Sequence, residues 1–171
     1  MNLDNIRVRV DKDYPEIVGA SDCKKTVNIL KNLATSRHGE LTAILQYTYQ
    51  SVVADKFMDN ISDILEEISI VEMMHLEMLM HAIVDFGGQP KYEDGQGQVF
   101  NSLNINYSMK LKEMLDNNIN AEMMAIEQYR HAIDMVSNAS LKNLFARIIE
   151  DENRHIEVFK EIRDSVTFLS I

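Results

Sequence analysis

The sequence predicts an all-α fold, a bundle of four long helices with one long crossover between the second and third helices. Apolar residues recur every three to four positions along four segments, which is the period of an amphipathic helix. The 171-residue chain has only 6 glycines, 2 prolines and no tryptophan, a balance that favours helices over sheets. Its two halves also resemble each other, as expected of a duplicated helical hairpin.

The first two helices are bounded by residues that interrupt helices. Residues 1–20 contain Pro15 and Gly19, so we expect an irregular N-terminal lead-in there. A first helix is expected over about 21–55 and a second from about 59 onward. The second helix should end at Gly87 and Gly88, with Pro90 close behind.

The segment 87–107 is long, polar and rich in glycine, and we expect it to be the crossover. A helix of roughly 30 residues is about 45 Å long, and twenty extended residues reach further than that. A third helix is expected over about 108–137 and a fourth from about 140 to 165. The predicted organisation is therefore one bundle, residues 21–165, followed by a short tail, residues 166–171.

Charge and cysteine content exclude several classes of function. With 17 basic and 27 acidic residues the formal net charge is −10, which repels phosphate backbones and anionic lipid, so we expect neither nucleic-acid nor membrane binding. No apolar run has the length of a membrane span. The single cysteine, Cys23, excludes an internal disulfide and any Cys-x-x-Cys site. The first residues also lack the apolar core of a signal peptide, and the expected location is the cytoplasm.

Two pairs of short segments carry the internal duplication. "ELTAILQY" (40–47) matches "EMMAIEQY" (122–129), and "VEMMHLE" (71–77) matches "DENRHIE" (151–157). Each half thus offers one glutamate on its first helix and a Glu-x-x-His pair on its second. Residues three apart share a helix face, so the glutamate and histidine of each pair can reach the same point. Counting residues from the helix ends places all of these groups near one level of the bundle.

Four carboxylates at one level of a bundle must either face solvent, as on an ordinary metal-free bundle, or be neutralised by cations. Burying them unpaired would cost several kcal/mol per ion, and like charges repel. Carboxylates combined with imidazoles and no thiolates suit iron or manganese. Six side chains are enough for two metal ions, and the predicted ligands are Glu40, Glu72, His75, Glu122, Glu152 and His155.

Over about residues 25–165 this pattern resembles the ferritin-like di-iron carboxylate proteins, which supply one glutamate from each of two helices and Glu-x-x-His from the other two. "ELTAILQY" and "IVEMMHLEML" are similar to rubrerythrin- and bacterioferritin-like bacterial members. The resemblance implies two metal ions, usually iron, bridged by Glu72 and Glu152. Glu40 and Glu122 would be terminal ligands, and each histidine would bind one metal.

The resemblance further implies an oxidase or peroxidase that reacts with O2 or H2O2, in oxidative stress or iron handling. Two alternatives stay open: a non-catalytic iron-binding protein of the ferroxidase storage type, and a di-manganese catalase. Rubrerythrins carry an additional glutamate where this chain has Ala125, and an iron domain built from four cysteines, which Cys23 alone cannot supply. We therefore expect an external electron donor. Ferritins have a fifth helix for which this chain is too short, so we expect a homodimer and no storage cage.

Two tyrosines have predicted roles beside the ligands. Tyr47 and Tyr129 lie two helical turns after Glu40 and Glu122, and we predict that they hydrogen-bond to the carboxylates and act catalytically as nearby electron donors. The alternative is a tyrosine that simply packs in the core.

Asp151 is predicted to orient His75, although Val71 stands at the matching place in the other half. Met73 follows Glu72 at the place where bacterioferritins bind haem, which is not expected here. The remaining histidines should be exposed or partly packed: His38, His81 and His131.

Overall fold

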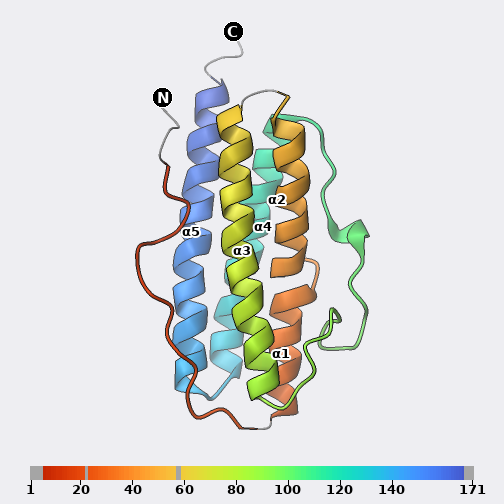
Figure 1. Cartoon of the computed structure of the whole chain (residues 1–171), viewed down its shortest axis with the longest axis vertical. Helices are drawn as coiled ribbons and strands as arrows, with labels where there is room; N and C mark the ends of the chain where they lie inside the picture. Colours follow the sequence, from red (N-terminus) through yellow and green to blue (C-terminus); the bar gives the residue numbers. More distant parts are fainter. Residues whose placement is uncertain (1–5, 22, 57–58, 168–171) are drawn as a thin grey trace.

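The computed structural model describes residues 6–21, 23–56 and 59–167 and confirms the predicted all-α four-helix bundle (Figure 1). Its helices are α1 (Lys24–Thr35), α2 (Glu40–Ala54), α3 (Asp59–Asp85), the short 3-10 helix η1 (Ser102–Asn104), α4 (Leu111–Met135) and α5 (Ala139–Thr167). Packing is closest within two antiparallel pairs, α2 with α3 and α4 with α5. Among the described residues no helix is long and apolar enough to cross a membrane.

The predicted single helix over 21–55 is wrong, because the chain breaks at residues 36–39 and forms α1 and α2, one above the other in Figure 1. Gly39 precedes α2 in an extended conformation. A Cβ atom there would lie 2.5 Å from the Leu33 carbonyl oxygen and 2.9 Å from the Thr35 amide nitrogen, so only glycine fits. The break places Glu40 in the first turn of α2 rather than in mid-helix.

The other predicted boundaries hold to within a few residues. After α3 the chain turns at Gly87, whose φ of +80° lies in the region that glycine adopts without steric cost. At the start of α5, Oδ1 of Asn138 accepts a hydrogen bond from the Leu141 amide at 2.9 Å, as a helix N-cap does. The third helix begins at Leu111, three residues later than expected.

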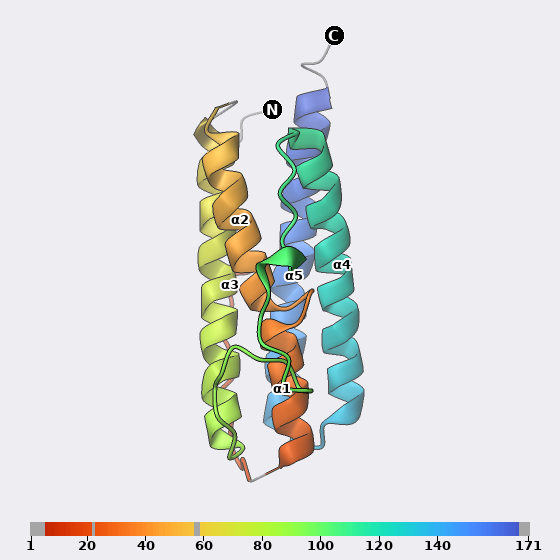
Figure 2. The same cartoon turned by 90° about the vertical axis from the view of Figure 1, so that its right-hand side faces the viewer.

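The crossover runs from the end of α3 to the start of α4, at the opposite end of the bundle (Figure 2). It is fastened along the way by side chains of the first two helices. Oε1 of Gln46 accepts from the Asn106 amide at 2.9 Å, and Oδ1 of Asn32 accepts from the Gly95 amide at 2.8 Å. The long segment therefore connects two parallel helices, which a short loop cannot do.

Two apolar clusters fill the interior, one on each side of the bundle's middle. The first packs around Leu65 and Phe159, and the second around Leu30, Leu79 and Phe145. Burying each such side chain contributes about 1.5–3 kcal/mol, so these clusters carry the stability of the bundle. Between them, α3 and α5 present polar side chains to the interior.

Candidate metal centre

All six predicted ligands lie together between the two apolar clusters. The ligands come from the four helices that the duplication predicts. One glutamate lies on α2 and one on α4, and one Glu-x-x-His pair lies on α3 and one on α5. All are buried, with exposed fractions of 3% or less: Glu40, Glu72, His75, Glu122, Glu152 and His155. The carboxylates therefore do not face solvent.

The six side chains form two overlapping groups of four, within each of which the ligand atoms lie within 4.8 Å of one another. One group is completed by Glu40 and His75, and the other by Glu122 and His155. Glu72 and Glu152 belong to both groups. Two shared carboxylates flanked by two terminal ones is the arrangement expected of two neighbouring cations.

The two histidines face the carboxylates in the same way. Nδ1 of His75 lies 3.0 Å from Glu72 and 3.4 Å from Glu152, and 3.8 Å from the terminal Glu40. Nδ1 of His155 lies 3.0 Å from Glu152 and 3.1 Å from Glu72, and 3.6 Å from the terminal Glu122. Each imidazole thus presents Nδ1 to one terminal and both shared glutamates.

Burial and crowding change the proton affinity of these groups. Desolvation and the nearby Glu152 charge raise the pKa of Glu40 from 4.5 to about 8, and the same two causes raise the pKa of Glu122 well above its ordinary value. Burial opposes protonation of the two histidines, but hydrogen bonds and charges from the surrounding carboxylates raise the pKa of each well above 6.5. Without cations the centre therefore holds protons, which a bound metal would displace.

The residues fit a pair of divalent cations. Oε1 of Glu72 and Oε1 of Glu152 are buried and have no hydrogen-bond partner among the residues that the structure describes. Their ion-pair partners are the Nδ1 atoms of His155 and His75, at 3.1 and 3.4 Å, and a cation between the shared glutamates would take the place of the histidine protons. The donor set is oxygen and imidazole nitrogen without thiolate, which suits iron or manganese.

Tyr47 and Tyr129 make the predicted hydrogen bonds to carboxylates, but each reaches across to the other half. The Tyr47 hydroxyl donates to Oε1 of Glu122, and the Tyr129 hydroxyl donates to Oε1 of Glu40. Both tyrosines are buried. They fix one oxygen of each terminal carboxylate, while their catalytic role stays a prediction.

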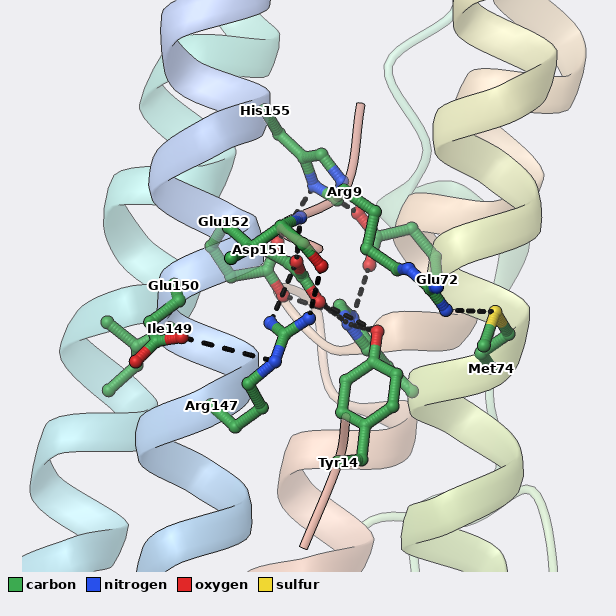
Figure 3. A network of polar contacts seen from close by, with 12 residues as sticks. Arg9, Tyr14, Glu72, Met74, Arg147, Ile149, Glu150, Asp151, Glu152 and His155 are labelled. Carbon is green, nitrogen blue, oxygen red and sulfur yellow. Dashed lines mark hydrogen bonds and ion pairs between the residues drawn. The ribbon is translucent and has the colours of Figure 1, made fainter. Parts of the chain in front are cut away.

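The predicted contact between Asp151 and His75 is also present, and it belongs to a larger network that the sequence did not reveal (Figure 3). Oδ2 of Asp151 lies 3.2 Å from Nε2 of His75 and accepts from the Tyr14 hydroxyl at 2.7 Å. Arg147 forms a 2.8 Å ion pair with Oδ1 of Asp151. The spacing of Arg147 and Asp151, one helical turn, was a usable signal, whereas nothing in the sequence points to Tyr14.

A cavity of about 190 Å³ between α2 and α4 reaches the centre. Its inner wall includes Glu40, Glu122 and Glu152, and its outer wall includes the exposed Arg37. Ala125, which stands where rubrerythrins have a further glutamate, lines it as well. The cavity connects the surface with the carboxylates and can admit a small molecule.

His81, His131 and Met73 lie apart from the centre, whereas His38 lines the cavity that reaches it. His38 is half-buried, and His81 and His131 are exposed, as predicted. Met73 is 46% exposed on the outer face of α3.

Comparison with protein families identifies the family of the chain. The rubrerythrin family model matches residues 31–163, which is most of the chain. The chain belongs to the rubrerythrin family. No curated protein matches it by sequence.

Solved structures of two other kinds of protein share the fold. A manganese catalase from Anabaena superposes with a TM-score of 0.83 at 24% identity, covering 94% of this chain and 82% of that one. A bacterioferritin from Rhodobacter capsulatus gives a TM-score of 0.75 at 23% identity, covering 88% of this chain and 90% of that one. The bacterioferritin from Desulfovibrio desulfuricans superposes with a TM-score of 0.72 at 25% identity, covering 85% of this chain and 81% of that one.

The family and the buried carboxylate–histidine cluster together indicate a two-metal site in this chain.

Proposed function

We propose that this protein holds two iron ions and reduces H2O2 or O2 with electrons from an external donor. The observation that carries the proposal is the pair of buried four-residue groups that share Glu72 and Glu152. In this assignment the shared glutamates bridge the metals, Glu40 and Glu122 are terminal ligands, and His75 and His155 bind one metal each through Nδ1.

When bound, two ferrous ions would supply the two electrons that convert H2O2, with two protons, into two molecules of water. The chain contributes position and exclusion of water. Hydrogen bonds from Tyr47 and Tyr129 hold Oε1 of each terminal carboxylate. In Glu40 the other oxygen, Oε2, faces Nδ1 of His75, whereas in Glu122 the held oxygen itself faces Nδ1 of His155. The apolar clusters on both sides keep bulk water from the ligands.

The cavity beside Ala125 is the proposed access route for the oxidant. Its volume of about 190 Å³ is well above the roughly 10–15 Å³ that a cavity needs to hold one water molecule, so it accommodates H2O2. A glutamate at position 125 would fill part of this space, whereas the alanine methyl group leaves it open. Substrate would then approach between Glu40 and Glu122, on the α2–α4 side.

A di-manganese catalase is a second candidate, supported by the similarity to the Anabaena manganese catalase. That reaction converts two H2O2 into two water molecules and one O2, and it needs no external electrons. An iron-oxidising storage role is a third, supported by the similarity to bacterioferritins.

The electron donor, location and assembly belong to the same proposal. We infer an external donor because Cys23 alone cannot form a four-cysteine iron site within the chain. A homodimer in the cytoplasm is proposed, formed through the outer face of α2 and α3. That face exposes four apolar side chains: Leu45, Val52, Ile70 and Met73.

The test is to load metal-free protein with Fe²⁺ or Mn²⁺ and to follow H2O2 and O2 with and without a chemical reductant. The proposal predicts that the iron form consumes H2O2 continuously only with reductant and evolves no O2. Evolution of one O2 per two H2O2 by the manganese form without reductant would establish the catalase instead. Iron that is oxidised and retained without turnover would establish storage. The same assays are run on Glu72→Gln, which alters a shared carboxylate. Glu77→Gln, an exposed change on α3, is the matched control.

A further inference from the structure

The N-terminal segment, residues 6–20, lies along α5 and is fastened to it by hydrogen bonds to its backbone (Figure 1). Nη2 of Arg147 donates to the carbonyl oxygens of Val10 and Lys12 at 2.8 and 2.9 Å. Nε of Arg154 donates to the carbonyl of Arg7 at 2.7 Å. Although this segment has no helix or strand, its backbone is held by side chains of α5, and Arg9 contacts Met74 of α3.

One side chain of this segment reaches the metal centre. The Tyr14 hydroxyl donates to Oδ2 of Asp151 at 2.7 Å (Figure 3). It also lies 3.3 Å from Nε2 of His75. The guanidinium of Arg147 lies over the Tyr14 ring, 4.5 Å from its centroid. The Val10 amide donates to the other carboxylate oxygen, Oδ1 of Asp151, at 2.8 Å. Nε2 of His75, the ring nitrogen that faces away from the ligands, is therefore contacted by Tyr14 and Asp151, which are themselves held by neighbouring groups.

The other histidine has no such support. Nε2 of His155 is buried and lacks a hydrogen-bond partner within the described part of the chain. Val71 occupies the place that corresponds to Asp151, and it is buried and apolar. The two halves of the centre therefore have matching ligands but differ in the residues that contact Nε2 of each histidine.

We propose that Tyr14, Asp151 and Arg147 position His75, so that the metal beside Glu40 and His75 binds first and more tightly than the metal beside Glu122 and His155. A carboxylate that accepts from the outer N–H of a ligating imidazole fixes the ring and strengthens it as a ligand. The Tyr14 hydroxyl and the Arg147 guanidinium fix that carboxylate in turn. This inference rests on the proposed two-metal site and adds an order of filling to it.

The test is a titration of metal-free protein with Co²⁺, monitored by calorimetry and by the visible absorption spectrum of the bound ion. Wild type should bind two ions in two resolved steps. In Tyr14→Phe the dissociation constant of the first step should rise about 10-fold or more, with the second step changed less than about twofold. Tyr49→Phe, which removes a hydroxyl bonded to the Tyr107 carbonyl elsewhere, should leave both steps unchanged.

A crystal structure with one equivalent of Co²⁺ identifies the first position directly. Anomalous scattering should place the ion beside His75 in wild type and divide it between both positions in Tyr14→Phe. An ion placed first beside His155, or equal weakening of both steps in the variant, would overturn the inference. Absence of Co²⁺ binding to wild type would instead overturn the two-metal site itself, so the two failures are distinguishable.

Discussion

The metal-free protein should become less stable as the pH rises from 5 to 8, because its centre holds protons that the unfolded chain does not. Burial raises the pKa of Glu40 to about 8 in the folded protein, whereas the unfolded residue has its ordinary value of 4.5. A group with a raised folded pKa stabilises fully below its unfolded pKa, and this contribution is lost as the pH rises through the folded pKa. Glu122, His75 and His155 have raised pKa values as well, so their contributions have the same sign.

The size of the effect follows from Glu40 alone. At pH 5 the unfolded glutamate is mostly ionised, whereas at pH 8 the folded one is about half protonated. At 1.36 kcal/mol per pKa unit, the free energy of unfolding falls by roughly 3–4 kcal/mol between these two pH values. A protein of this length loses about 2–4 °C of Tm per kcal/mol, so the metal-free Tm should drop by roughly 7–14 °C. The lowered pKa of Glu72, where attraction to His155 and His75 outweighs burial, acts only below pH 4.5.

The assay is calorimetric melting of chelator-treated protein across pH 5–8, beside protein loaded with Mn²⁺. Metal requires deprotonated ligands, so the loaded protein should show the opposite slope, with stabilisation by metal growing as the pH rises. In metal-free Glu40→Gln the pH dependence should be shallower, whereas the exposed Glu77→Gln should follow wild type. A metal-free Tm that stays constant or increases from pH 5 to pH 8 would refute the proposed storage of protons at the centre.

Three variants test other parts of the structure. Gly39→Ala places a Cβ against backbone atoms of α1, so it should destabilise the protein by about 1–3 kcal/mol in denaturant unfolding and weaken metal binding in a titration. Unchanged stability would show that the break tolerates a side chain. Tyr47→Phe combined with Tyr129→Phe removes both hydrogen bonds to terminal carboxylates and should weaken metal binding about 10–100-fold; equal affinity would mean that the hydroxyls only pack. Ala125→Leu should lower kcat/KM for H2O2 about tenfold with metal content unchanged, and undiminished turnover would place the access route elsewhere.

The duplicated spacing was sufficient to predict the ligand cluster, because helix geometry alone brings residues at matched heights to one level. The same logic failed at residues 36–39. The apolar pattern lapses over residues 35–40 and resumes at Leu41, a gap of about two helical turns within the predicted single helix. The break depends on how closely the Gly39 backbone approaches the Leu33 carbonyl, a contact that periodicity does not contain.

The partners behind the ligands were harder to predict. Tyr47 was placed near a carboxylate by its spacing from Glu40, but it bonds to Glu122 because α2 and α4 face each other across the centre. Tyr14 lies in a segment without periodicity, 61 residues from His75 in sequence, and only the path of that segment along α5 brings the two together. Sequence spacing predicts contacts within and between regular helices, and it is silent about irregular segments.

The most direct test of the account is the metal content of purified protein, produced with iron or with manganese and measured beside Glu72→Ala and Glu77→Ala. Glu72 belongs to both four-residue groups, whereas Glu77 is exposed on the same helix. We predict about two ions per chain in wild type and in Glu77→Ala, and a large loss of both ions in Glu72→Ala. Two ions retained by Glu72→Ala, or none in wild type with either metal, would contradict this prediction.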